Sequence, residues 1–236
     1  QARNGERYEL NLIDTPGHVD FSYEVSRSLH ACEGALLIID AAQGVEAQTV
    51  ANVHLAMQQD LEIVPIINKV DLPHADIEAA KLQLEDVLTI PADNAICASA
   101  KTGQGIEEIL EAIVEHIPAP QPTEGMPLQA LAYDSYYDSY RGVVIHVRVF
   151  NGELNPGTAV QMLHSGRTVE VKEVGSFNPK PFAREKLTAG ETGYMIGNIR
   201  APRDVKMGDT ITDANQPAPE LPGFKEVHPM VFSGIY

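Results

Sequence analysis

The chain has 236 residues, which allows two domains of ordinary size, and 44% of them are hydrophobic, which is enough to fill real cores and excludes a disordered chain. The formal net charge is −16 at pH 7, and residues 1–117 hold 20 acidic against 6 basic side chains. This acidity argues against an autonomous nucleic-acid-binding domain, and we expect no DNA partner. No apolar run approaches the length of a membrane-spanning helix, and the N-terminus has no signal-peptide pattern.

Strand-like and helix-like patterns alternate along the first half of the chain. Short apolar runs at 8–13, 35–39, 63–67 and 95–98 predict strands, and apolar residues at helical spacing predict helices around 21–29, 50–57, 77–87 and 106–117. The run at 35–39 is typical of a parallel strand that is covered on both faces. This alternation predicts an α/β domain with a mostly parallel sheet flanked by helices.

The pattern changes after a stretch rich in proline at 118–127, which we interpret as a stiff linker. Apolar residues then alternate at 143–149, Asn151-Gly152 gives a strong hairpin signal, and further strands are predicted at 159–163, 168–174, 193–199 and 210–212. Such spacing predicts a small β-barrel. The predicted organisation is an α/β domain at 1–117, the linker, a barrel at 128–215, a second linker at 216–223, and the truncated start of another domain at 224–236.

Three polar motifs each follow a predicted strand. They are Asp14-Thr15-Pro16-Gly17-His18, Asn68-Lys69-Val70-Asp71 and Ser99-Ala100-Lys101. Each motif by itself can also be ordinary turn or loop chemistry. Because the carboxyl ends of parallel strands meet at one edge of an α/β sheet, where ligands bind, their shared position favours a nucleotide site.

The first motif offers groups for a phosphate and its metal ion. Asp14 can hold Mg²⁺ directly or through a coordinated water. Gly17 can present a backbone N–H to a terminal phosphate at close range, and His18 is placed to orient the attacking water.

The second and third motifs offer groups that can read guanine. The Asp71 carboxylate can accept two hydrogen bonds from the ring N–H and amino group of guanine, a pattern that adenine cannot supply. The aliphatic stem of Lys69 can cover one face of the base. Residues 99–101 form the other wall, with the Ala100 N–H available to the guanine oxygen.

Four tyrosines lie near the start of the predicted barrel, at Tyr133, Tyr136, Tyr137 and Tyr140. Their rings can stack on RNA bases, but packing on the strands and the barrel rim is the favoured interpretation.

Several stretches resemble one family closely. Residues 14–21 are similar to the switch motif of translational GTPases, and residues 22–29 and 31–35 resemble the LepA, or elongation factor 4, family. Residues 141–144 and 208–210 resemble the barrel that follows the GTPase domain in these factors, and residues 221–225 and 229–232 resemble the junction to the next domain. The chain is therefore identified as a member of this family.

The resemblance implies ribosome-dependent GTP hydrolysis, with GTP or GDP and Mg²⁺ as cofactors and ribosomal RNA of both subunits as partner. It further implies a role in back-translocation, fidelity or initiation, in the cytoplasm and peripherally on the cytoplasmic face of the inner membrane. The implied nucleotide-binding residues are Asp14, Thr15, Pro16, Gly17, His18, Asn68, Lys69, Asp71, Ser99, Ala100 and Lys101, with His18 catalytic and Asp14 on the metal.

The sequence departs from the family in one large respect, because no GxxxxGK[ST] phosphate loop and no first switch occur in it. We therefore expect a fragment of a GTPase that is inactive alone and lacks the C-terminal domains. Two alternatives stay open at this point: a GTPase like elongation factor G or BipA, and a non-catalytic module that docks on RNA or protein.

Overall fold

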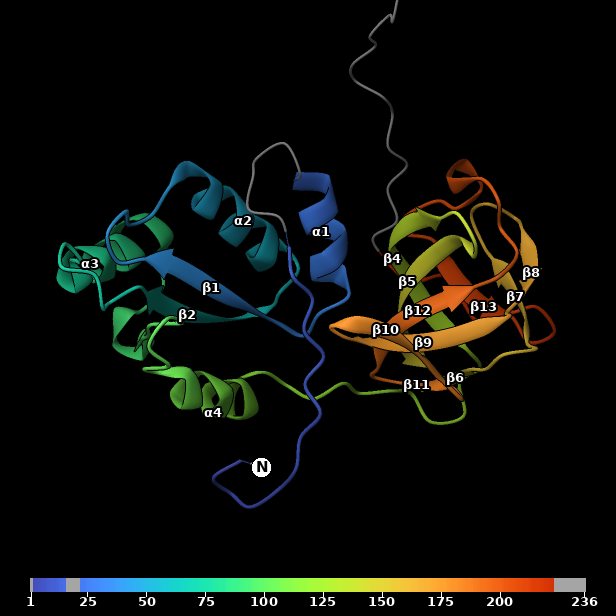
Figure 1. The fold of residues 1–236 in the computed structure, drawn as a ribbon, viewed down its shortest axis with the longest axis horizontal. Coiled ribbons are helices and arrows are strands. Elements are labelled where there is room, and N and C mark those ends of the chain that lie inside the picture. The colour runs from blue at the N-terminus through green and yellow to red at the C-terminus, as the bar shows by residue number, and fades with distance from the viewer. Residues whose placement is uncertain (1, 16–21, 223–236) are drawn as a thin grey trace, which may run out of the picture. The chain divides into compact units, whose positions relative to one another are not determined.

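The computed structural model of the protein describes residues 2–15 and 22–222. The chain divides after Gln121 into two compact units, an α/β unit and a unit of antiparallel strands (Figure 1). In the described residues, no helix combines the length and the apolar character needed to cross a membrane.

The described part of the first unit contains a parallel sheet with the order β1-β2-β3, formed by β1 (Gly34–Asp40), β2 (Glu62–Asn68) and β3 (Ile96–Cys97). A helix precedes the first strand and others follow each strand: α1 (Ser22–His30), α2 (Ala47–Gln58), α3 (Ile77–Leu88), with the short 3₁₀ turn η2 (Ala92–Asn94), and α4 (Ile106–His116). This arrangement confirms the predicted α/β class.

Successive side chains of each strand point to opposite faces of this sheet. Ile39 and Ile67 pack with residues of α2 and α3, and Val25 of α1 packs against Ala56 of α2. The other helix, α4, lies on the opposite side of the sheet (Figure 1).

Two helix ends have clear local causes. The Asp76 carboxylate accepts a hydrogen bond of 2.9 Å from the Ala79 N–H and so caps the start of α3. Before α4, Gly105 has a φ of +76°, and a Cβ there would lie 2.5 Å from the Cys97 carbonyl oxygen. Glycine is therefore required where the loop after β3 turns into α4.

The predicted strand at 8–13 is wrong, because residues 6–15 form no strand in the structure. Leu12 is 82% exposed, and Tyr8 and Leu10 are nearly half exposed. An alternating pattern forms a strand only where a neighbouring strand can complete its hydrogen bonds, and no strand lies beside this segment in the described residues. The expectation that the run at 35–39 is covered on both faces also fails, since Ile38 is 59% exposed.

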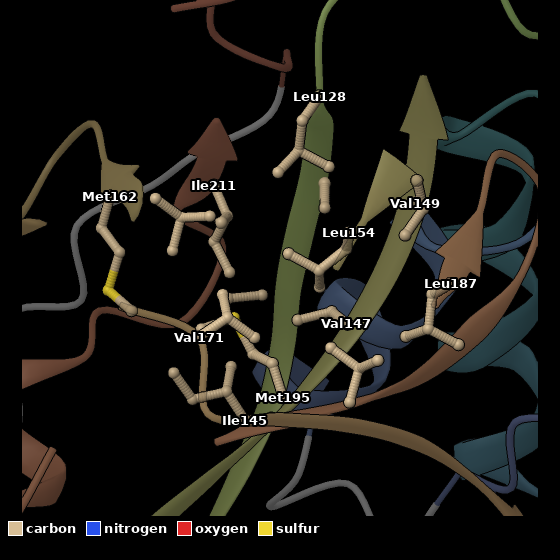
Figure 2. Packing of buried hydrophobic residues seen from close by; sticks show 14 of the residues in the cluster. Leu128, Ile145, Val147, Val149, Leu154, Met162, Val171, Leu187, Met195 and Ile211 are labelled. Atoms are coloured by element: carbon tan, nitrogen blue, oxygen red, sulfur yellow. The ribbon is translucent and has the colours of Figure 1, made fainter. Parts of the chain in front are cut away.

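The second unit is built from strands that run antiparallel to their neighbours, in the order β10-β9-β12-β5-β4-β13-β7-β8, with β11 paired to β6. The strands are β4 (Gln129–Asp138), β5 (Gly142–Asn151), β6 (Glu153–Leu154), β7 (Ala159–Met162), β8 (Thr168–Glu170), β9 (Glu173–Asn178), β10 (Lys180–Arg184), β11 (Leu187–Thr188), β12 (Thr192–Ile196) and β13 (Thr210–Asp213), and a 3₁₀ turn, η3 (Pro202–Asp204), precedes the last of them. The sheet curls around a core of aliphatic and methionine side chains (Figure 2). This confirms the predicted barrel-like domain of the translation-factor type.

The hairpin predicted at Asn151-Gly152 does not form. β5 pairs with β4 and β12, whereas β6, which follows the turn, pairs with β11. Gly152 has a φ of +68°, and a Cβ there would lie 2.7 Å from the Leu128 nitrogen. The dipeptide therefore makes a tight corner that moves the chain from one sheet to another. The single strand predicted at 168–174 is likewise two strands, β8 and β9.

A second apolar cluster, Val144, Tyr194 and Ile196, lies on the face of β5 and β12 that is turned away from the core. On the same face, the His146 ring meets three aromatic rings edge-on, with centroid distances of 5.8 Å to Tyr133, 5.6 Å to Tyr136 and 5.0 Å to Phe177. Packing on the barrel is thus confirmed for Tyr133 and Tyr136. It is wrong for Tyr137 and Tyr140, which are 57% and 98% exposed.

His146 gives the barrel a pH-dependent stability. Burial lowers the pKa of His146 below its usual value, and Asp134, 3.7 Å from Nδ1, opposes this only in part. Because the folded state binds this proton less well than the unfolded state, stability falls as the pH drops through the usual histidine range toward the folded-state pKa. Below both pKa values the loss is complete.

We therefore expect His146→Phe to be more stable than the original chain, by a margin that is larger at pH 5 than at pH 7.5. At pH 7.5 the gain is about 1 kcal/mol, because Nε2 is buried without a hydrogen-bond partner among the described residues. Urea unfolding followed by tyrosine fluorescence measures this, since the chain has no tryptophan. A margin that is the same at both pH values would contradict the role of the histidine.

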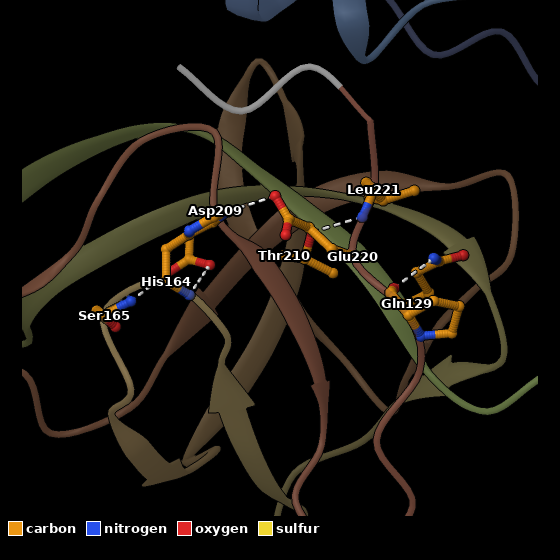
Figure 3. A network of polar contacts seen from close by, with 8 residues as sticks. Gln129, His164, Ser165, Asp209, Thr210, Glu220 and Leu221 are labelled. Carbon is orange, nitrogen blue, oxygen red and sulfur yellow. Dashed lines mark hydrogen bonds and ion pairs between the residues drawn. The ribbon is translucent and has the colours of Figure 1, made fainter. Parts of the chain in front are cut away.

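Residues 216–222, predicted as a linker, run along the barrel and are bonded to it (Figure 3). The bonds run from the Ala218 N–H to Thr212 Oγ1 (2.6 Å), from the Leu221 N–H to Thr210 Oγ1 (2.9 Å), and from Gln129 Nε2 to the Pro219 carbonyl (2.8 Å), together with a contact between His164 Nε2 and Glu220. Thr210 and Thr212 are fully buried beneath this segment. Residues 216–222 are therefore held in place on the barrel by these hydrogen bonds.

Candidate functional site

Two of the three motifs lie side by side at the carboxyl edge of the sheet. Residues 68–71 begin at the last residue of β2, and residues 99–101 follow β3, which is the parallel neighbour of β2. The Ala98 N–H donates to the Ile67 carbonyl (2.8 Å), and the Val70 N–H donates to the Ala98 carbonyl (3.2 Å), so the pairing continues past the strand ends. The sheet therefore fixes the spacing of the two loops.

Side chains then join the loops directly. Ser99 Oγ donates a hydrogen bond of 2.6 Å to Asp71 Oδ1, and the Ala100 N–H donates one of 3.1 Å to Asn68 Oδ1. Ser99 is completely buried, and its Oγ also accepts from the Thr102 N–H at 3.2 Å. The buried Ser99 hydroxyl therefore orients the Asp71 carboxylate.

The Asp71 carboxylate presents its second oxygen outward. Asp71 is exposed, and Oδ2 makes no hydrogen bond to any residue in the described ranges. One oxygen is anchored and the other is free, so the group can accept hydrogen bonds from a planar donor edge. The Ala100 N–H, expected to face the guanine oxygen, is instead engaged with Asn68 in this structure.

Lys69 leaves the end of β2 in an unusual conformation, with a φ of +64°. Its Nζ lies 2.6 Å from Oδ2 of Asp40, the last residue of β1. The hydrogen bond from Lys69, followed by that from the Ala42 N–H, lowers the pKa of Asp40, and Asp40 in turn raises the pKa of Lys69. Both groups therefore stay charged through the neutral range.

Asp40 was not among the predicted site residues. The signal that could have found it is its position, because an acid at the carboxyl end of a strand next to β2 must lie close to the loop that carries Lys69. Lys101, by contrast, is exposed and makes no hydrogen bond or ion pair with the rest of the loops in the described part of the chain, in keeping with a residue at the rim.

The first motif is only partly described. Asp14 is exposed and Thr15 is half-buried, and no hydrogen bond or ion pair joins Asp14 to the two loops among the described residues. Pro16, Gly17 and His18 lie outside the described residues. The predicted union of all three motifs is therefore not tested.

A magnesium ion is the metal that a nucleoside triphosphate would bring. Asp14 is an exposed carboxylate, the hard oxygen donor that Mg²⁺ prefers, and Mg²⁺ typically takes one or two carboxylates with its other positions filled by water and phosphate oxygens. A single acid at this position therefore fits the ion. The described residues contain no cluster of three or more acidic, histidine or cysteine side chains that could hold a metal without such help.

Comparison with known proteins assigns the chain to a protein family. A family model for the elongation factor Tu GTP binding domain matches residues 2–119, and one for elongation factor Tu domain 2 matches residues 142–212. Elongation factor 4 of Streptococcus uberis is 56% identical over 236 residues, and those of Streptococcus pyogenes serotype M4 and Streptococcus agalactiae serotype III are 57% identical over the same length. The chain belongs to the elongation factor 4 (LepA) family.

All of this chain, but only 39% of each of those relatives, is covered by the match. Within the family assignment, residues 2–119 contain all three polar motifs and the Asp40–Lys69 pair. Residues 142–212 contain β5 to β12 and most of β13, so the barrel corresponds to the second domain of elongation factors. The LepA resemblance predicted from the sequence is confirmed.

Proposed function

We propose that this chain supplies the guanine-reading edge and the second domain of a ribosome-dependent GTPase of the elongation factor 4 type. The observation that carries the proposal is the pair of hydrogen bonds that lock residues 68–71 against residues 99–101. A site that is ordered before its ligand arrives loses less conformational entropy on binding. The free oxygen of Asp71 is then held ready for the donor edge of guanine.

In the proposed site, Asp71 accepts from the ring N–H and amino group of guanine, and the Lys69 stem covers one face of the base. Asn68 holds the two loops together through its bond to Ala100. Residues 99–101 form the opposite wall, where Ala100 can turn its N–H from Asn68 toward the guanine oxygen. These contacts bind and select the nucleotide without taking part in the chemical step.

The chemical step is assigned to the first motif. Asp14, with Thr15 and Pro16 beside it, is the proposed Mg²⁺ position, Gly17 the proposed donor to the terminal phosphate, and His18 the residue that orients water. Bound Mg²⁺ would neutralise charge that develops on the phosphate oxygens. These roles rest on the family resemblance of residues 14–18.

The proposed partner is the ribosome, through RNA of both subunits, and the proposed role is in back-translocation, fidelity or initiation. Identity of 56–57% with elongation factor 4 along the whole chain supports this type over one like elongation factor G or BipA. The proposed place of action is the cytoplasm, where ribosomes work. The family resemblance also leads us to propose peripheral association with the cytoplasmic face of the inner membrane.

Titration with a fluorescent GDP analogue and Mg²⁺ tests the proposal. We expect tight binding by a chain extended to the full length of its relatives, and much weaker binding by residues 1–236, which contain no GxxxxGK[ST] loop to cradle the phosphates. Equal, tight binding by both would show that the base-reading loops suffice. Binding by neither would favour the non-catalytic docking module.

A further inference from the structure

Asp40 is held rigidly at the end of β1. Its Oδ1 accepts from the Ala42 N–H (2.8 Å), and its carbonyl accepts from the Gly44 N–H (2.8 Å), which closes a tight turn. The Ala41 N–H donates to the Asn68 carbonyl (2.8 Å) and ties this turn to β2. The side chain is therefore fixed before any ligand is present.

The turn is also braced from α3. Gln83 Oε1 accepts from the Val45 N–H at 2.6 Å, and the Asp76 N–H donates to the Ala41 carbonyl at 2.8 Å. Residues 40–45 thus have contacts with β2 and with α3. A carboxylate on such a support can hold a flexible partner in one place.

That partner is Lys69, whose two ends are both fixed. Its backbone is held in the left-handed region by the strand end, and its carbonyl accepts from the Leu72 N–H at 3.1 Å. Its ammonium lies 2.6 Å from Asp40 Oδ2. A free lysine side chain samples many rotamers, and ordering it opposes binding. Here the four-carbon stem is stretched between two anchors.

We propose that Asp40 is a positioning residue of the guanine site, which holds the Lys69 ammonium so that the aliphatic stem lies ready as a wall for the base. The inference rests on the proposed guanine-reading role of residues 68–71. It assigns to Asp40 no contact with the nucleotide. A plain turn residue would act only on stability, so the two roles are separable.

Asp40→Asn separates them because an asparagine oxygen can still accept from the Ala42 N–H, whereas the charge that holds Lys69 is lost. In the full-length chain we expect release of fluorescent GDP to quicken by about threefold to tenfold, the loss of one partly solvent-screened charged hydrogen bond. The melting temperature should barely change. The release rate of the original chain should rise more steeply with salt than that of the variant, since salt screens the exposed ion pair that only the original chain has.

A double-mutant cycle shows whether Asp40 acts through Lys69. In a Lys69→Met background, Asp40→Asn should have no further effect on GDP release. Asp76→Asn is the matched control, because Asp76 also accepts from a backbone N–H but has no lysine partner among the described residues. It should release GDP at the original rate.

Two results would overturn the inference while leaving the proposed function in place. One is an unchanged release rate in Asp40→Asn, and the other is an equal acceleration in the presence and absence of Lys69. If the original full-length chain fails to retain GDP, the proposed function falls and the role of Asp40 falls with it.

Discussion

Asp71→Asn is expected to weaken GDP binding by the full-length chain by about 100-fold to 1000-fold, while xanthosine diphosphate binding becomes the stronger of the two. The carboxylate accepts two charge-assisted hydrogen bonds from guanine, each worth about 1.5–3 kcal/mol. An asparagine in the same place turns an N–H donor toward the guanine amino group, and two donors cannot pair. Xanthine carries an oxygen acceptor there. Competition titration with the two diphosphates measures the ratio.

Ser99→Ala is the matched control for this change. It removes the 2.6 Å bond that orients Asp71 but leaves the carboxylate in the loop. We expect weaker GDP binding without any preference for xanthine, because the acceptor pattern is unaltered. If Asp71→Asn binds both diphosphates as the original chain does, Asp71 is not the residue that reads the base.

The position of the two guanine loops could be predicted from the sequence because it depends on a general property of parallel sheets. Two buried apolar runs, each followed by a polar motif, place those motifs at one edge. The hydrogen bond from Ser99 to Asp71 then follows from two short side chains on adjacent strand ends. Neither step requires knowledge of distant parts of the chain.

The place of Asp40 near the loop that carries Lys69 could be predicted in the same way, but the contact of its carboxylate with the Lys69 ammonium could not. This contact depends on a left-handed backbone at Lys69, which lysine rarely adopts, and on a turn at 40–44 that is fixed by α3. Sequence patterns report which face of a strand is apolar. They do not report where a long, flexible side chain ends.

Two of the errors of local structure, the strand at 8–13 and the hairpin at 151–152, have a common cause. Residues 8–13 alternate as a strand does, and Asn151-Gly152 has the composition of a hairpin turn, but a strand and a hairpin each require a partner at the right place. The first segment has none among the described residues, and at the second the following strand pairs with β11 instead. A local sequence pattern indicates a possible strand or hairpin, and whether it forms depends on a pairing partner elsewhere in the chain.

The family resemblance at residues 208–210 has a structural explanation. Asp209 is fully buried, and its two oxygens accept from the His164 N–H (2.8 Å) and the Ser165 N–H (3.0 Å), as Figure 3 shows. The next residue, Thr210, receives the Leu221 N–H from the segment that leaves the barrel. Asp209 thus holds the loop at 164–165, and Thr210 holds the segment at 216–222 that follows the barrel. The motif stabilises the fold of the barrel.

Asp209→Ala is therefore expected to destabilise the barrel by about 2–4 kcal/mol, because two buried backbone N–H groups lose their acceptor at once. For a domain of this size, that corresponds to a fall in melting temperature of about 10–20 °C. Tyrosine fluorescence reports the barrel selectively, since five of the eight tyrosines lie between residues 133 and 194. The loss is a large fraction of the stability of an ordinary domain.

Asp209→Asn tests whether the loss of barrel stability follows the number of acceptors that are removed. An amide oxygen can replace one of the two acceptors, whereas the amide nitrogen faces the second N–H as another donor, so we expect an intermediate loss. The order of melting temperatures is then original, asparagine, alanine. Glu220→Gln, which alters only the exposed contact with His164, should melt close to the original chain. If the alanine variant also melts there, the buried carboxylate does not hold the loop, and the motif at 208–210 must owe its place to something other than the stability of the barrel.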